Sequence, residues 1–272
     1  MGSESGGWLG LEGRVCVVTG AGSGIGTETA RHFASAGACV AVLDRHAAAA
    51  ADVAAQIVRE GGRAIGVQAD VAIAATVAAA AKRIHAELGP CRVLVNNAAV
   101  RHREALMDLG LDAWNKVLTV NLTGALICTQ VLARQMIAAG NGGSIVHVSS
   151  IVSRNPQFDG GAYSASKAGL GMLSRSLALE LARHHIRSNV VSPGFVLTPA
   201  NEALYRDPET AAARQRLIPA GRVALPADLV NVILFLASDR ADYVDGQDIH
   251  VDGGVGTTLM SRVPRAPGGK SA

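Results

Sequence analysis

A tyrosine and a lysine stand one helical turn apart, at Tyr163 and Lys167. Both continue into an apolar stripe through Leu170, because residues three and four positions apart share one face of a helix. An ammonium group near a phenol favours the phenolate and lowers the pKa of the tyrosine. The pair therefore predicts a proton-transfer group. The alternative is an amphipathic helix start with a lysine that extends to solvent.

A short apolar run at 144–148 predicts a buried strand that ends in Ser149 and Ser150. Side chains alternate along a strand, so these two serines should point in opposite directions. A turn-rich connection follows, and a long helix is expected to begin near Tyr163. This arrangement allows Ser150 to approach the Tyr163–Lys167 pair.

A glycine-rich turn, Gly20-Ala21-Gly22-Ser23-Gly24-Ile25-Gly26, follows the first apolar run at 14–19. Such a turn lets a pyrophosphate approach a helix N-terminus, where free N–H groups and the helix dipole favour an anion. An ordinary βα loop is the alternative, since the spacing is not the commonest one. The position between a strand and a helix favours dinucleotide binding.

Asp44 ends the second predicted strand, eighteen residues after Gly26. A carboxylate there can accept hydrogen bonds from the adenosine ribose and repels a 2′-phosphate, which favours NAD over NADP. The absence of a basic residue at Ser23 agrees. Arg45 could instead pair with a phosphate, and a solvated strand-end aspartate is the bland alternative.

Strands and helices alternate along the chain at intervals of roughly 25–30 residues, which predicts a single-domain, Rossmann-like doubly wound α/β fold. About seven parallel strands with helices on both faces are expected. The predicted strands are 14–19, 38–44, 63–70, 91–95, 144–148, 186–192 and 247–252, and long helices include 47–60, 73–88, 112–139 and 226–237. One domain over 11–256 follows, between a flexible N-terminus (1–10) and a C-terminal tail (257–272).

The composition bounds the class of protein. The chain of 272 residues is 49% apolar and 17% charged, which is enough apolar material for a buried core. A net charge of +3 without a Lys/Arg block disfavours nucleic acid as a partner. No apolar run of eighteen residues and no signal peptide are found, so a cytoplasmic protein without a membrane partner is expected. Four scattered cysteines predict no metal site.

The ordered motifs resemble the short-chain dehydrogenase/reductase superfamily over residues 14–254. The matching segments are TGAGSGIG (19–26), Asp44, Asp70-Val71, NNAA (96–99), Asn121, Ser150, YSASK (163–167), PGFVLT (193–198) and VDGG (251–254). One segment could arise by chance, but the ordered set with its spacing is specific to this superfamily.

The resemblance implies four catalytic residues. Tyr163 would be the general acid/base at the substrate oxygen, and Ser150 would stabilise charge on that oxygen. Lys167 would bond the nicotinamide ribose and lower the pKa of Tyr163. Asn121 would hold a water that links Lys167 to solvent, although a structural, buried asparagine is a fair alternative.

The resemblance also implies the cofactor contacts. In the family, the backbone at Val196 meets the carboxamide, and the Thr198 hydroxyl meets the carboxamide or a phosphate. Ala99 stands where the family more often has glycine, so a small local adjustment is expected. The full predicted cofactor set is Gly20, Ser23, Gly24, Ile25, Gly26, Asp44, Arg45, Asp70, Val71, Asn97, Ala98, Ala99, Tyr163, Lys167, Pro193, Gly194, Val196 and Thr198.

The substrate pocket is implied by resemblance alone. It would be lined by the residues after the fourth strand, those after Ser150, and the irregular segment 195–222, which is expected to form a substrate lid. Arg101, His102 and Arg154 could recognise a polar or anionic substrate, whereas Phe158, Leu204 and Tyr205 could recognise an apolar one. For each of them, solvent-exposed surface is the favoured explanation.

The function predicted from these residues is an NAD-dependent oxidoreductase that interconverts a secondary alcohol and a ketone by hydride transfer. An NADPH-dependent 3-oxoacyl-thioester reductase is the alternative within enzymes, and Asp44 disfavours it. A catalytically silent NAD-binding regulator is the alternative outside them. The resemblance further implies a homo-tetramer, built on the helix that carries Tyr163 and on the helix 112–139. The sequence does not identify the substrate.

Overall fold

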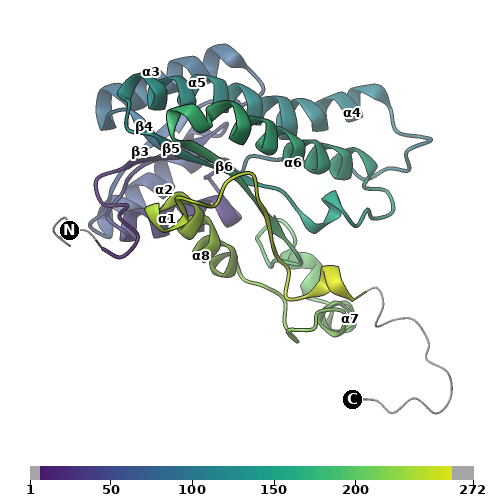
Figure 1. Cartoon of the computed structure of the whole chain (residues 1–272). Helices are drawn as coiled ribbons and strands as arrows, with labels where there is room; N and C mark the ends of the chain where they lie inside the picture. Colours follow the sequence, from purple (N-terminus) through teal and green to yellow (C-terminus); the bar gives the residue numbers. More distant parts are fainter. Residues whose placement is uncertain (1–6, 259–272) are drawn as a thin grey trace.

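The computed structural model describes residues 7–258, and one parallel sheet of seven strands runs through them (Figure 1). The strand order is β3-β2-β1-β4-β5-β6-β7. The strands are β1 (Val15–Thr19), β2 (Cys39–Asp44), β3 (Arg63–Gln68), β4 (Cys91–Asn96), β5 (Gly143–Val148), β6 (Ile186–Pro193) and β7 (Asp248–Val251). The predicted doubly wound fold is confirmed.

Helices cover both faces of the sheet (Figure 1). On one face lie α1 (Gly24–Ser35), α2 (Ala47–Arg59) and α8 (Pro226–Ala237), and on the other α3 (Ala74–Leu88), α5 (Gly124–Ala139) and α6 (Gly161–Leu181). The central strands are buried on both sides, which explains their continuous apolar sequences. Two apolar cores result, one on each face of the sheet.

The strand order reverses between β1 and β4, since β2 and β3 extend to one side of β1 while β4 begins the other half. In open parallel sheets, ligands bind beyond the carboxyl ends of the strands at such a switch point. Thr19 and Asn96 end the two strands that meet there. The glycine-rich turn and the NNAA segment therefore face each other at this edge.

The predicted helix 112–139 is one continuous stretch with a change of winding inside it. It consists of α4 (Leu111–Leu118), one turn of π-helix (Thr119–Thr123, the π-turn) and α5. Its length and apolar composition would suffice to cross a membrane. In this fold, however, α5 packs against α3 and β4, and α4 packs against α6. These contacts are those of a helix in a globular core.

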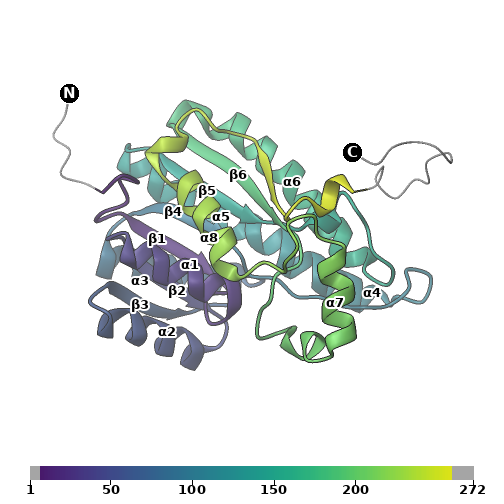
Figure 2. The same cartoon turned by 90° about the horizontal axis from the view of Figure 1, so that it is seen from below.

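The predicted lid segment folds as two short helical pieces, a 3₁₀ turn (Glu202–Tyr205) and α7 (Pro208–Arg216). They stand apart from both helix layers (Figure 2). Val196 pairs with Ala224 in an isolated bridge, so the two ends of the segment lie side by side. Ile218 is buried, whereas neither helical piece buries a residue.

Other boundaries differ slightly from expectation. β3 ends at Gln68 rather than Asp70, because Asp70 instead accepts a hydrogen bond from the Ala72 amide and begins a turn. Of the predicted loose termini, residues 1–6 and 259–272 lie outside the described residues. Trp8 is described, and its carbonyl accepts a hydrogen bond of 2.8 Å from Arg240.

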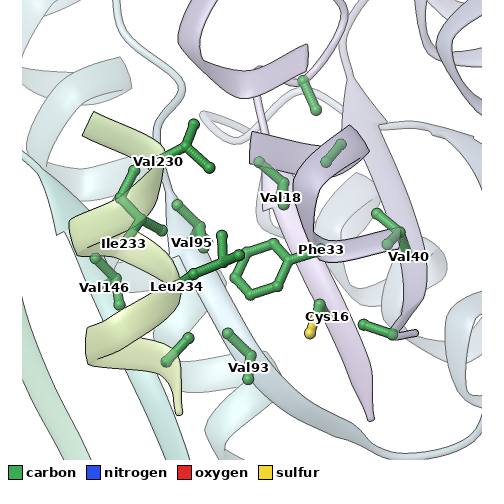
Figure 3. Close-up of a cluster of buried hydrophobic side chains, with 14 of the residues drawn as sticks. Cys16, Val18, Phe33, Val40, Val93, Val95, Val146, Val230, Ile233 and Leu234 are labelled. Carbon is green, nitrogen blue, oxygen red and sulfur yellow. The ribbon is translucent and has the colours of Figure 1, made fainter. Parts of the chain in front are cut away.

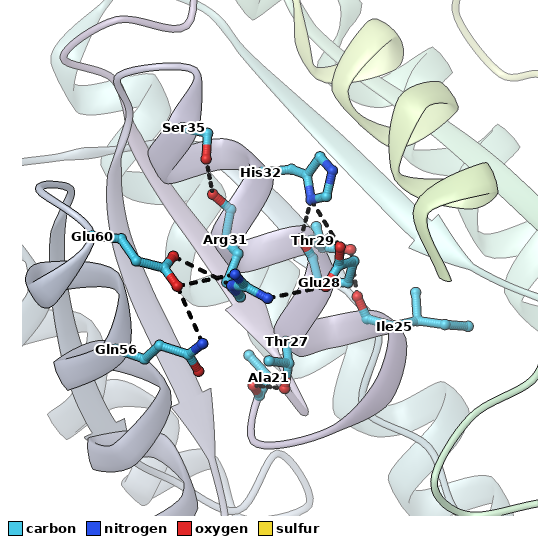
Figure 4. A network of polar contacts seen from close by, with 10 residues as sticks. All are labelled: Ala21, Ile25, Thr27, Glu28, Thr29, Arg31, His32, Ser35, Gln56 and Glu60. Carbon is cyan, nitrogen blue, oxygen red and sulfur yellow. Dashed lines mark hydrogen bonds and ion pairs between the residues drawn. The ribbon is translucent and has the colours of Figure 1, made fainter. Parts of the chain in front are cut away.

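Phe33 fixes α1 in the core on the face it shares with α8. Its ring is fully buried among Val18, Val95 and Leu234, so residues from α1, α8 and the sheet meet at one place (Figure 3). On the outer side of α1, Arg31 pairs with Glu60 just after α2 at 3.0 Å (Figure 4). This ion pair is solvent-exposed and contributes little, so the buried contacts set the position of α1.

We expect Phe33→Ala to lower the free energy of unfolding by about 3–5 kcal/mol, because it removes a fully buried ring and leaves a cavity. Urea denaturation at fixed protein concentration measures the change. Val58→Ala, at a half-exposed position on α2, is the control and should change stability by less than about 1 kcal/mol. Equal effects of the two substitutions would contradict this account of the core.

Candidate active site

Ser150, Tyr163 and Lys167 meet beyond the carboxyl end of β5. Ser150 follows the strand, and the other two lie in the first two turns of α6. All three are buried. Ser150 is one of the groups that lower the pKa of Tyr163, and its hydroxyl accepts a hydrogen bond of 3.4 Å from the Val152 amide. Ser149 points elsewhere, as predicted, and donates to the Lys167 carbonyl at 3.0 Å.

The Lys167 ammonium is held by the end of β5. Its Nζ donates to the Val148 carbonyl at 2.7 Å and lies 5.6 Å from the centroid of the Tyr163 ring. Burial lowers the pKa of Lys167, Tyr163 opposes that shift, and the positive charge of Arg101 adds to it. A buried ammonium favours a neighbouring group that can carry negative charge.

The Tyr163 hydroxyl is such a group. Burial alone raises the pKa of Tyr163, but the charges of Lys167 and Arg101 and hydrogen bonds from Arg101 and Ser150 lower it by more. The resulting pKa lies below the ordinary value. The phenol can therefore give up its proton and take it back at a lower pH than a free tyrosine.

Arg101 was predicted only as a possible substrate residue, but its guanidinium contacts Tyr163 directly. Its Nη2 donates to the Tyr163 hydroxyl at 3.3 Å, and its guanidinium carbon lies 4.5 Å from the ring centroid. Of the other suggested substrate residues, Leu204 is exposed, and Tyr205 is half-buried with the Arg214 guanidinium 5.1 Å from its ring centroid. His102 pairs with Glu104 at 3.0 Å, Arg154 pairs with Asp248 at 3.4 Å, and Phe158 is almost fully exposed.

Asn121 lies in the π-turn and is buried, as predicted. Its Oδ1 accepts from the Val100 amide at 2.8 Å, and its Nδ2 donates to the Val100 carbonyl and the Ser166 hydroxyl, each at 3.0 Å. The side chain thus fixes the backbone that precedes Arg101. π-turns occur often at functional sites. The water-holding role of Asn121 stays a prediction.

The glycine-rich turn is packed tightly against the NNAA segment. A Cβ at Gly20, where φ is +62°, would lie 2.7 Å from the Ala98 Cα, and one at Gly26 would lie 2.6 Å from Asn97 Nδ2. The positive φ and the close approach both require glycine. Gly24 leaves more room, with Thr198 3.8 Å from its added Cβ. A phosphate group fits beside this turn, at the N-terminus of α1.

Thr19, at the end of β1, also belongs to the site, although its role was not predicted from the sequence. Its hydroxyl accepts hydrogen bonds from the amides of Asn97 and Ala98, at 3.0 and 3.1 Å. Asn97 Nδ2 in turn donates to the carbonyls of Thr19 and Gly20. The position of Thr19 at the end of the first strand is the sequence feature that could have identified it as a site residue. The Ser166 hydroxyl accepts a hydrogen bond from Asn121 Nδ2. Ser166 lies within the YSASK motif, but the sequence predicted no role for it.

Asp44 ends β2 and lies against the middle of the turn. Its two carboxylate oxygens accept hydrogen bonds from the amides of Gly22 and His46, both at 3.0 Å. An ionised carboxylate has about four acceptor positions, so two remain for a ligand. The next two residues, Arg45 and His46, line a cavity of about 550 Å³ together with Gln68, Ala69, Asp70 and Thr76. These residues fit the adenosine end of a dinucleotide.

The remaining predicted cofactor residues gather around the same edge. Val71 is buried and packs against Gly124, where an added Cβ would lie 2.9 Å from Val71 Cγ2. Gly194 directly follows β6, and Val196 is buried beyond it. The structure also places Ser23, Ile25, Ala99, Pro193 and Thr198 along this edge, at strand ends, at the first turn of α1 or on the loop after β6.

Comparisons with known proteins agree with this architecture. The profile of a family described as enoyl-(acyl carrier protein) reductase matches residues 20–256. Cis-4-hydroxycyclohexanecarboxylate dehydrogenase from Sinomonas cyclohexanicum is 45% identical over 89% of this chain and 96% of its own length. D-threitol dehydrogenase from Mycolicibacterium smegmatis is 38% identical over 90% of this chain and 93% of its own.

A solved structure is also similar. A gluconate 5-dehydrogenase from Burkholderia cenocepacia, in complex with NADP and tartrate, superposes with a TM-score of 0.87 at 35% identity, over 91% of this chain and 97% of its own. The chain belongs to the short-chain dehydrogenase/reductase superfamily. It is an NAD(P)-dependent oxidoreductase that acts on CH–OH groups, and the thioester-reductase alternative is not favoured.

Replacing Lys167 by methionine should raise the pKa of Tyr163, because it removes a positive charge that lowers that pKa. The ultraviolet absorbance of tyrosinate, followed as a function of pH, measures the shift. The chain has three tyrosines, so subtracting the titration of Tyr163→Phe isolates the signal. Lys116→Met, at an exposed position on α4, is the control and should leave it unmoved. A Tyr163 pKa unchanged in Lys167→Met would refute the electrostatic coupling.

Proposed function

We propose that this protein interconverts a secondary alcohol and a ketone with NAD as the preferred cofactor and Tyr163 as the general acid/base. The observation that carries the proposal is the buried Tyr163 hydroxyl, which receives hydrogen bonds or positive charge from Ser150, Lys167 and Arg101. A secondary alcohol bound against Tyr163 and Ser150 would lose its hydroxyl proton to the phenolate. NAD, when bound, supplies the hydride acceptor.

Each further residue has a separate task in this proposal. Ser150 donates to the substrate oxygen as negative charge develops there. Lys167 lowers the pKa of Tyr163 and reaches the nicotinamide ribose, and Asn121 holds the water that connects Lys167 to solvent. The glycine-rich turn binds the pyrophosphate, because its amides and the α1 N-terminus present partial positive charge. The segment 195–222 closes over the substrate as a lid.

The preference for NAD rests on Asp44. Two backbone amides fix its carboxylate beside the cavity expected to receive adenosine. There it would accept bonds from the ribose hydroxyls and repel a 2′-phosphate. Arg45 lines the same cavity and is the residue through which NADP could bind instead. Two similar solved structures contain NADP, so the relative affinity of this protein for NADH and NADPH is the quantity to measure.

The oligomeric state and location complete the proposal. We infer a homo-tetramer, as the resemblance to the superfamily implies. An exposed row of small and apolar side chains on α6 could contact a second copy; it consists of Ala165, Ala168, Met172 and Leu179. Burial of such a row by a second copy is favourable. Sedimentation of the purified chain tests this inference. A cytoplasmic location agrees with four buried, unpaired cysteines.

Asp44→Asn should weaken NADH binding by about tenfold to a hundredfold, the effect expected for hydrogen bonds to a charged group, and should improve NADPH binding. Fluorescence titration gives both dissociation constants. Asp52→Asn removes an exposed carboxylate from α2 and serves as the matched control. Tighter binding of NADPH than of NADH by the unaltered protein would reverse the proposed preference.

Tyr163→Phe should lower kcat by about 10²- to 10⁴-fold, because it removes the proton-transfer group, while the dissociation constant for NADH changes little. NADH formation is measured across a panel of sugars, polyols, steroids, cyclic alcohols and hydroxy acids. The panel includes D-threitol and 4-hydroxycyclohexanecarboxylate, for which relatives are named. If the unaltered protein and Tyr163→Phe both bind NADH but are equally inactive on the whole panel, the silent regulator is the better description.

A further inference from the structure

We propose that Arg101 binds a carboxylate of the substrate, so that the alcohol oxidised here is a hydroxy acid rather than a neutral alcohol. This inference rests on the proposed function, since it assigns the substrate of the same site. It is carried by the position of the guanidinium, by the absence of an acidic partner for it, and by the way its backbone is held.

The guanidinium lies beside the Tyr163 hydroxyl, which would exchange a proton with the substrate oxygen. It is 3.3 Å from the Tyr163 hydroxyl and 4.5 Å from the ring centroid. A carbinol oxygen that hydrogen-bonds Tyr163 would therefore place its neighbouring carbon atoms within reach of Arg101. An anionic group a few bonds away from the carbinol meets the guanidinium without any movement of α6.

Arg101 has no acidic partner among residues 7–258. None of the ion pairs formed by residues 7–258 includes it. Its neighbours differ, because His102 is paired with Glu104 and Arg154 with Asp248. Arg101 is thus a cation at the reacting atom that a ligand can still pair.

The surroundings favour an anion further. Lys167 Nζ also lies 5.6 Å from the centroid of the Tyr163 ring, so two cations are close to one phenol, and each lowers its pKa. Between Arg101 and Lys167 the described structure supplies no acidic side chain to the site. A bound carboxylate offsets this positive charge and makes two parallel hydrogen bonds with the planar guanidinium.

The backbone at Arg101 is also fixed. Both the amide and the carbonyl of the preceding residue, Val100, are hydrogen-bonded by the buried Asn121 side chain. The guanidinium also lies over the Tyr163 ring, in a cation–π contact. A cation held in place before the ligand arrives loses little conformational freedom on binding. Arg101 is an exposed loop residue, but its backbone is held by Asn121 and its guanidinium lies over the Tyr163 ring, as expected of a specificity determinant.

The test compares one skeleton with and without the negative charge. The probes are 4-hydroxycyclohexanecarboxylate, its methyl ester and its primary amide, each assayed with NAD and the unaltered protein, Arg101→Met, Arg101→Lys and Arg103→Met. Arg103→Met is the matched control, because it removes the same charge from an exposed position of the same loop.

The unaltered protein should use the carboxylate at least about tenfold better than the ester or amide in kcat/KM. Arg101→Met should lower kcat/KM for the carboxylate by about tenfold to a hundredfold, mostly through KM, and affect the neutral probes much less. Arg101→Lys should restore part of the preference, since it keeps the charge without the two-point contact. Arg103→Met should keep the full preference.

Two results would overturn the proposal. One is equal use of all three probes by the unaltered protein. The other is an equal loss on all three probes in Arg101→Met, with the pH profile of kcat displaced upward. That second pattern would mean that Arg101 acts only through the charge state of Tyr163.

A binding measurement separates this inference from the proposed function. Calorimetric titration of the NADH-bound protein with cyclohexanecarboxylate should show binding that Arg101→Met loses, and cyclohexanecarboxamide should bind weakly to both. This result supports the carboxylate site even if no probe is turned over, in which case only the assigned reaction fails. Equal binding of the acid and the amide, or no binding of the acid, rejects the site itself.

Discussion

The burial of the Lys167 ammonium is the constraint around which the catalytic corner is built. A buried cation is costly unless it is hydrogen-bonded and near compensating charge. Here the Val148 carbonyl provides the hydrogen bond, at 2.7 Å, and the Tyr163 phenol is the group that can become negative. Burial disfavours both charged groups, but the positive charge of Lys167 favours the phenolate and contributes to a Tyr163 pKa below the ordinary value.

That placement depends on the register of the sheet beneath it. β5 ends at Val148, with Ser150 two residues beyond it. A buried series of hydrogen-bonded side chains fixes the strands on either side. Asn96 Nδ2 donates to His147 Nδ1 at 3.3 Å, and His147 Nε2 donates to Ser188 Oγ at 3.2 Å. Burial and the charge of Lys167 lower the pKa of His147 to about 3, so it stays neutral. These hydrogen bonds link β4, β5 and β6 without adding charge beneath the site.

Much of this could be predicted from the sequence, because local patterns determine it. Continuous apolar strands, intervening helices and glycines at strand ends specify the doubly wound sheet, and the spacing of Tyr163 and Lys167 puts them on one face of α6. The π-turn at Asn121 could not be predicted, since the apolar pattern of 112–139 continues through it. Nor could the partners of Asn121, because Val100 and Ser166 reach it only through the tertiary fold.

Arg101 shows the same limit at the place where specificity arises. In the sequence it is one of several charged residues on a loop after β4, no different from His102 or Arg103. Only the packing of that loop on α6 brings its guanidinium onto Tyr163, while His102 turns to Glu104. The scaffold and the proton-transfer group are thus written in regular, local patterns, whereas the choice of substrate depends on a loop side chain whose position the rest of the fold determines. Because Asn121 holds both the π-turn and Val100, the element that supports the catalytic corner also positions the residue that would select its substrate.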